Sequence, residues 1–572
     1  MFRLPFLSIL FIWLAGCSGT TIQPATIDPK TMLGKEQGLV VLEVVNNTHR
    51  LSEKHNGWTE VIALRVDPLD AARQDVQQAA EEADETYDPE QVKWKPDVYS
   101  LTPAKEGTQT SQLFVGSLPP GDYMISRLFS YDGNSDVTMW ISMPVMQASG
   151  LFHVSNGTVS NLGTLVFQPL SNIEKTAFWE WRSSDKGFVT RLPEQTDLHN
   201  FVFTKYPEYR STFQPDNNAW NPDALDNLRN QLASLVKQNA YASQAVRLNQ
   251  SDQRALLGKL GQLKIIDQDN HWNSFSLPTN DQLNAILETD QGLIVGSERG
   301  QLFTLMPDRS WFSSHPVPRT EAIVWLGSSP DTHFALTRSD QNYYVYQFTD
   351  VQEAWEQVNH FVAPASTGME EKVSAFIGSD DILHIISHNK HYRYHQSEKS
   401  WDSQPSPAIW NVQKLKDGTL TGNKFALMGL QATQVISVDD GISWQKISRS
   451  TTGQSNSKAK VSPVAILENG LVVTSGKPYS ARLDSTQRFI LTSSKADVQK
   501  RNSWQSHYPI YPYCQTLIPQ LTNANTLFFL CSDGSIVSTP DLGKSWQTEM
   551  NIDLNAMLKT YTGLLNSLKQ TE

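Results

Sequence analysis

Two stretches near the C-terminus decide the fold of this chain: SVDDGISW at residues 437–444 and TPDLGKSW at residues 539–546. Each holds a hydroxyl residue, an aspartate, a glycine and a tryptophan at one spacing: Ser437, Asp439, Gly441 and Trp444, then Thr539, Asp541, Gly543 and Trp546. The hydroxyl and the carboxylate accept hydrogen bonds from free backbone N–H groups, and glycine adopts backbone angles that other residues resist. Each stretch therefore predicts a tight turn between two strands, closed by a tryptophan that buries a large flat side chain.

These two tryptophans belong to a longer series, with successive intervals of 39, 44, 46, 43, 60 and 42 residues. The series consists of Trp272, Trp311, Trp355, Trp401, Trp444, Trp504 and Trp546. A period near 45 residues with four short strands in each unit is typical of a β-propeller. The sequence therefore predicts seven blades within residues 243–551.

The pattern [ST]-x-D-x-G-x-x-W resembles the Asp-box, or BNR, repeat of sialidase-like propellers. The segment GLIVGSERGQL at 292–302, which precedes Trp311, resembles the frame of photosystem II assembly-factor-like propellers with seven blades. Both resemblances imply a propeller scaffold in which the Asp-box residues hold turns at the blade edges.

The N-terminus reads as an export signal. Residues 1–16 combine a short basic start with an apolar run that is too short to span a bilayer. The following LAGC motif at 14–17 resembles a bacterial lipobox, which implies lipidation of Cys17; an ordinary signal peptide with an incidental cysteine is the alternative. Because Ser18 and not aspartate follows Cys17, the resemblance implies a Gram-negative outer-membrane lipoprotein. Residues 17–38 then predict a tether.

Short β-type runs separated by turn residues predict an antiparallel β-sandwich over residues 39–170. Within it, SLPPGDY (117–123) and FHVSNGTVSNLG (152–163) resemble transthyretin-like and PEGA-like accessory domains. Residues 171–242 predict a connector with one helix, whose leucine stripe we expect to pack on the propeller. Residues 552–572 have a helical period and predict a closing helix docked on the propeller; an extra strand is the alternative.

Two further cysteines, Cys514 and Cys531, lie symmetrically about residues 521–524. A hairpin that turns there places them opposite each other, at a spacing that suits a disulfide. Two buried free thiols are the alternative.

Several classes of site have no support in the sequence. The formal net charge of −12 indicates no nucleic-acid partner. No cofactor motif appears, and the crowded histidines of one unit lack a zinc-type spacing, so we expect no metal there but a solvated or stacking face: His384, His388, His391 and His395.

An anchor and two scaffold domains, without an assignable catalytic residue, predict a non-enzymatic envelope protein. Its propeller would present a surface to a protein or glycan partner, with Arg299, Arg338 and Arg393 as candidate contact residues at the propeller mouth. The alternative is a glycoside hydrolase of the sialidase-like or xyloglucanase-like class. That activity needs two facing carboxylates, for which the blades offer Glu298, Asp340 and Asp381.

Overall fold

The computed structural model begins inside the segment 17–38, which was predicted as a tether; residues 22–24 of that segment form a strand of the sandwich, so this part of the prediction is wrong. It describes residues 22–27, 33, 36–47, 57–93, 96–104, 111–134, 137–145, 149–169, 174–175, 181–182, 187–192, 198–216, 219–267, 270–351, 353–363, 373–387, 389–425, 432–447, 463–476, 487–511, 514, 516–523, 526–531 and 533–571. The predicted signal peptide and Cys17 lie outside the described residues. Among the described helices, none has the length and apolar character needed to cross a membrane.

The N-terminal domain is a β-sandwich, as predicted. One sheet runs in the order β1 (Ile22–Pro24), β4 (Val98–Leu101), β3 (Glu60–Arg65), β6 (Gly121–Asn134) and β7 (Val137–Pro144), with β8 (Leu151–Val154) beside β6. The other runs β12 (Gly187–Leu192), β9 (Thr158–Pro169), β2 (Gly38–Asn46) and β5 (Ser111–Leu118), with β13 (Gln214–Asp216) beside β9. Most pairs are antiparallel, but β1–β4, β2–β9 and β13–β9 are parallel.

Strand β2 is buried along its whole length. Because successive side chains alternate between the faces of a sheet, Val40, Leu42 and Val44 enter the core between the two sheets. Leu39 and Val41 point the other way, into a second apolar cluster that includes helix α4 (Leu198–Lys205). The second sheet is thus covered on both faces.

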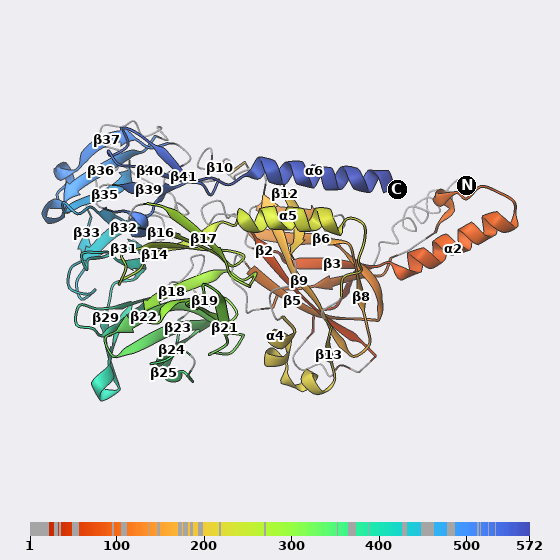
Figure 1. Ribbon diagram of the computed structural model, residues 1–572, viewed down its shortest axis with the longest axis horizontal. Coiled ribbons are helices and arrows are strands. Elements are labelled where there is room, and N and C mark those ends of the chain that lie inside the picture. Colours follow the sequence, from red (N-terminus) through yellow and green to blue (C-terminus); the bar gives the residue numbers. More distant parts are fainter. Residues whose placement is uncertain are drawn as a thin grey trace, which may run out of the picture.

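The segment 171–242, expected as a connector with one helix, contributes more than that. It supplies β12 and β13 to the sandwich, a two-stranded pair of β10 (Glu174–Lys175) and β11 (Trp181–Arg182), and two helices. Helix α4 is followed by a short 3-10 helix, η3 (Pro207–Ser211), and then by α5 (Asp226–Gln238). Earlier in the chain, α2 (Asp67–Glu82) projects from the end of the sandwich that lies away from the propeller, and η2 (Pro89–Gln91) follows it (Figure 1).

Helices α5 and α6 (Leu554–Thr571) lie side by side along the sandwich (Figure 1). They share one apolar cluster with β2 and β12, and the ring of Phe188 on β12 stacks on Tyr561 of α6 at 4.8 Å. The C-terminal helix is therefore present, but it does not dock on the propeller alone. An amphipathic stripe shows that a helix has a partner surface without saying which one it is.

Residues 242–550 form seven antiparallel sheets of four strands each, which confirms the predicted propeller. The first four blades are β14 (Ala242–Arg247), β15 (Arg254–Gly258), β16 (Gln262–Ile266), β17 (Trp272–Ser276); β18 (Leu283–Thr289), β19 (Gly292–Ser297), β20 (Leu302–Leu305), β21 (Trp311–Ser314); β22 (Ala322–Ser329), β23 (Thr332–Ser339), β24 (Asn342–Phe348), β25 (Glu356–Val362); β26 (Ser374–Ile377), β27 (Leu383–Ser387), β28 (Lys390–His395), β29 (Ser400–Pro405). The last three are β30 (Ile409–Lys414), β31 (Leu420–Phe425), β32 (Ala432–Ser437), β33 (Gln445–Lys446); β34 (Ala465–Ile466), β35 (Leu471–Gly476), β36 (Phe489–Ser494), β37 (Gln505–Pro509); β38 (Thr516–Leu517), β39 (Leu527–Leu530), β40 (Ile536–Thr539), β41 (Gln547–Met550). Short 3-10 helices lie between strands: η4 (Gln396–Glu398), η5 (Lys495–Asp497), η6 (Arg501–Ser503) and η7 (Pro519–Leu521).

The seven tryptophans of the repeat occupy equivalent positions. Each lies at or just before the fourth, outermost strand of its blade: Trp272 opens β17, for example, and Trp444 precedes β33. Trp355 is buried, and the other six are half-buried. The tryptophan repeat therefore predicted equivalent positions in all seven blades. How far each tryptophan side chain is buried depends on its contacts with the neighbouring blade.

The ring closes between blades 7 and 1 without strand exchange, because each sheet takes its strands from one continuous segment. An apolar cluster joins the two blades, with Leu256 and Ile266 on one side and Phe528 on the other. The indole N–H of Trp272 donates to Glu549 at 3.2 Å. Side-chain packing between blades 7 and 1 therefore closes the propeller, whereas other propellers are closed by a strand exchanged between the first and last blades.

Candidate functional site

The propeller has two faces that differ in their surroundings. Turns between the second and third strands lie on the face that meets the sandwich, which we call the sandwich face. Lys259, in this turn of blade 1, donates to the Asn46 carbonyl at 2.7 Å, and Gly534, in this turn of blade 7, lies against the Tyr241 ring. Turns between the first and second strands, and between the third and fourth, lie on the opposite face, which we call the distal face.

Arg299 lies in the joint between the two domains. Its guanidinium donates from Nη2 to Glu43 Oε1 of β2 at 2.8 Å, and the side chains are 5% and 0% exposed. The expectation that Arg299 contacts a ligand at the propeller mouth is not met, because the sandwich covers it. The sequence held one signal of this contact: Glu43 is the one charge in the apolar run of β2.

Three carboxyl groups are buried in this joint: Glu43, Asp281 and Glu298. Ser111 and Thr164 donate hydroxyl hydrogen bonds to Glu43 at 2.6 and 2.9 Å, and Ser297 donates to Asp281 at 3.1 Å. Burial raises the pKa of Glu43, although Arg299 opposes that shift. Burial and the neighbouring Glu43 raise the pKa of Asp281 to about 7.

The other two candidate arginines lie on other blades. Arg393, on β28, donates to both carboxylate oxygens of Asp402, at 2.9 and 3.0 Å, and its side chain is partly exposed. The same aspartate contacts His395 at 2.9 Å. Arg338 lies half-buried on β23 of blade 3. Arg299 and Arg393 thus belong to two separate ion pairs, one buried and one exposed.

The two matching turns of blades 5 and 7 have the same hydrogen bonding. Asp439 accepts from the Ser443 backbone N–H at 2.9 Å, and the Ser437 hydroxyl accepts from the Gly441 N–H at 2.9 Å. The second turn repeats both bonds, at 2.8 Å each, with Asp541, Ser545, Thr539 and Gly543. Both glycines have positive φ, 84° and 97°.

The carboxylates of these turns are occupied by the turns themselves. Burial opposes ionisation of Asp439, but the hydrogen bonds from Ser443 and Ser437 outweigh it and lower the pKa. For Asp541 the hydrogen bonds from Ser545 are the main cause of the lowered pKa. Both groups hold the shape of the distal face.

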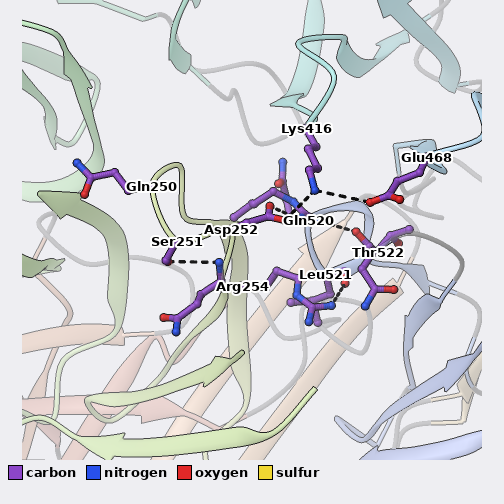
Figure 2. A network of polar contacts seen from close by, with 12 residues as sticks. Gln250, Ser251, Asp252, Arg254, Lys416, Glu468, Gln520, Leu521 and Thr522 are labelled. Atoms are coloured by element: carbon purple, nitrogen blue, oxygen red, sulfur yellow. Dashed lines mark hydrogen bonds and ion pairs between the residues drawn. The ribbon is translucent and has the colours of Figure 1, made fainter. Parts of the chain in front are cut away.

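An ion-pair network crosses the axial end of the distal face (Figure 2). Lys416, in the first turn of blade 5, lies 2.8 Å from Asp252 of blade 1 and 3.6 Å from Glu468 of blade 6. Arg247 also contacts Asp252, at 2.6 Å. In chain order, blades 6 and 7 lie between blade 5 and blade 1, so the Lys416–Asp252 pair joins blades that are not neighbours.

The 3-10 helix η7 of blade 7 adds a plug beside this network (Figure 2). Gln520 donates to the Lys414 carbonyl of blade 5 at 3.0 Å, and Arg254 of blade 1 donates to the Leu521 carbonyl at 3.0 Å. The turn therefore reaches from blade 7 to both blades. Neither contact is predictable from the repeat, because η7 departs from it.

The predicted disulfide is present: Cys514 and Cys531 are bonded, with Cα atoms 3.7 Å apart. They flank β38 and β39, whose pairing places Thr516 opposite Leu530. The bond therefore closes the base of the hairpin that carries η7 at its tip.

The expected solvated or stacking histidine face is found in part: the ring of His384 stacks on Phe376 and is tilted against His391, while His395 is partly exposed. His384 and His391 are buried and lie 2.9 Å apart between Nδ1 and Nε2, and Asp380 contacts His384 at 3.1 Å. Burial lowers the pKa of both, that of His391 to about 4. His388 lies outside the described residues. Within the described part of the chain, no three His, Cys, Asp or Glu side chains gather in a way that suits a metal ion.

The acids proposed for a hydrolase have other surroundings. Glu298 is buried in the joint, and Asp340 and Asp381 occupy turn positions with φ of 54° and 59°. Asp252 and Glu468, at the axial end, both contact Lys416.

Comparison with known proteins gives the class of the fold. No protein-family model matches the chain, and no curated protein matches it. Among solved structures it is similar to virginiamycin B lyase from Staphylococcus aureus (10% identity, 53% of this chain, 95% of that chain, TM-score 0.36). It is also similar to the Swd1 β-propeller domain of Myceliophteria thermophila (12%, 52%, 95%, 0.35) and to YCF48 from Cyanidioschyzon merolae (12%, 48%, 86%, 0.34).

The strand topology by itself defines a protein with a seven-bladed β-propeller joined to a β-sandwich. At these low TM-scores the similar structures carry no argument about activity or partner.

Proposed function

We propose that the chain is a lipid-anchored scaffold of the cell envelope, whose propeller presents its distal face to a protein partner. The anchor is Cys17 in the lipobox-like motif. The shared cluster of β2, β12, α5 and α6, together with the buried joint, supports a propeller held in one orientation on the sandwich. Such a fixed orientation suits presentation of a surface.

Two exposed aliphatic side chains support the choice of the distal face as the binding surface and of a protein as the partner. Val438 and Ile442, in the turn of blade 5 on the distal face, are 60% and 54% exposed. Their backbone is held by the hydrogen bonds of that turn, and Asp440 between them accepts from the Ser379 N–H at 3.0 Å. Branched aliphatic side chains on a rigid turn favour contact with apolar protein surface, and they offer no ring on which a sugar stacks.

Site-specific photo-crosslinking in cells tests this proposal. A benzophenone amino acid in place of Ile442 should capture a discrete envelope protein. The matched control is Phe312, which is 48% exposed on β21 at the outer edge of blade 2. No captured protein at 442, or the same capture at 312, contradicts the choice of face. Binding of oligosaccharides that Ile442→Asp abolishes would instead support a glycan partner.

The anchor has its own test. Cys17→Ala should release the protein from membranes, while Ser18→Ala at the next position should leave it bound. Membrane association of the Cys17→Ala variant after signal cleavage contradicts lipidation at this residue.

A further inference from the structure

The joint between the sandwich and the propeller concentrates acidic groups in a dry place. Glu43 comes from β2, and Asp281, Glu298 and Arg299 come from blade 2 and the segment that leads into it. All four residues are buried. Among the residues that the structure describes, full ionisation would place three negative charges near the guanidinium of Arg299, and a low-dielectric interface disfavours that excess.

Hydrogen bonds from both domains fix this cluster in place. Arg299 Nη2 contacts Ser111 Oγ of β5 at 2.9 Å, so one arginine reaches Glu43 and a neighbouring strand. Asn280, next to Asp281, donates to Thr164 of β9 at 3.3 Å. The carboxyls therefore cannot leave the dry region while the domains stay docked.

We propose that the joint is a proton-linked latch, which holds the sandwich on the propeller most tightly when the carboxyl cluster carries a bound proton. Separating the domains hydrates Glu43 and Asp281 and lets them ionise. Docking therefore takes up protons, and the latch weakens as the pH rises.

The direction follows from the groups in the joint. Asp281, with its pKa raised from 3.8 to about 7, favours the docked state below its ordinary pKa and loses that contribution as the pH rises to about 7. Glu43 acts in the same direction. Arginine side chains stay charged at these pH values. Burial lowers the pKa of Lys237 to about 8, so this lysine changes its charge above the pH range in which Asp281 titrates. Lys237 reaches the Thr279 carbonyl at 3.2 Å.

Hydrogen–deuterium exchange of the full chain tests the latch, with rates corrected for intrinsic exchange at each pH. Protection of β2 (38–46) and of residues 280–300 should fall between pH 5.5 and pH 8, whereas protection of β27 and β28 in blade 4, where burial lowers the pKa of His384 and His391, should not fall. Asp281→Asn, which mimics the protonated acid, should keep the joint protected at pH 8. Glu43→Gln is a second variant of the same kind.

The matched control is Asp252→Asn on the distal face, where the pKa of the native aspartate is lowered and not raised. It should leave the pH dependence of the joint unchanged. Three results overturn the proposal: equal joint protection at both pH values in the native chain, an unchanged pH dependence in Asp281→Asn, or a parallel loss of protection in blade 4. If Asp281→Asn does not fold, the pH dependence of joint protection in the native chain and in Glu43→Gln still tests the proposal.

Discussion

The joint and the distal face both contain acids paired with cations, yet the two regions have opposite electrostatics. In the joint, burial raises the pKa values of Glu43 and Asp281. On the distal face, burial is outweighed by the hydrogen bonds from Lys416 and Arg247, which lower the pKa of Asp252. The same residue types therefore form a buried contact that disfavours ionisation of the carboxyl groups and a solvent-exposed contact that favours it. Exposure decides between the two.

The largest expected effect comes from breaking the buried pair. Arg299→Ala leaves Glu43 and its neighbours buried without their guanidinium, and we expect a loss of about 3–5 kcal/mol in the free energy of unfolding. Chemical denaturation measures it. Arg393→Ala is the matched control, because it removes an arginine from an exposed pair with Asp402 and should cost about 1 kcal/mol or less. Equal losses in the two variants would show that burial does not separate these regions.

The disulfide closes a hairpin of blade 7 that runs from the sandwich face to the plug on the distal face. Replacing both Cys514 and Cys531 by serine should lower the free energy of unfolding by about 3 kcal/mol, given their sequence separation of 17. Denaturation of the oxidised protein with and without reductant measures it. The Ser/Ser variant should not respond to reductant. A loss under about 0.5 kcal/mol would mean that the plug is held by its contacts with blades 1 and 5.

A smaller effect is expected for the turns of the distal face. Asp439→Ala removes the acceptor for the Ser443 N–H and should cost about 1–2 kcal/mol. Asp541→Ala should cost a similar amount, because the second turn repeats the bond. Thermal unfolding compares the two. A cost for Asp439 alone would indicate that the contact of the neighbouring Asp440 with Ser379 of blade 4 depends on this turn.

The smallest effect is expected at the axial end. Lys416→Ala should cost about 0.5 kcal/mol, because the lysine is 56% exposed, and less at high salt. The lowered pKa of Asp252 means that its ion pairs stabilise the fold above the ordinary aspartate pKa, and that this contribution is lost as the pH falls through the folded-state pKa. Denaturation at several pH values checks it. An effect of Lys416→Ala that persists after Asp252 is protonated contradicts this account.

Several features were readable from local chemistry. The tryptophan period predicted seven blades, the turn residues predicted where strands end, and the symmetry of Cys514 and Cys531 predicted the disulfide. Each depends on residues close together in the chain or on a fixed repeat. The lipid anchor and the partner stay predictions.

Other features depended on surfaces that meet only in three dimensions. The stripe of α5 and the period of the last helix predicted two amphipathic helices, but not that these helices would cover the sandwich together. Arg299 was predicted to contact a ligand, because the sequence around it does not indicate that it pairs with Glu43, which is 256 residues away.

By itself, the sequence determined the scaffold: a β-sandwich, seven blades in register and a stapled hairpin, because period, turn chemistry and alternation act over short distances. Only the tertiary structure decided which charges are buried. It placed Glu43, Asp281 and Arg299 in one dry joint and left Asp252 and Lys416 in water, because burial depends on which surfaces the folded chain brings together.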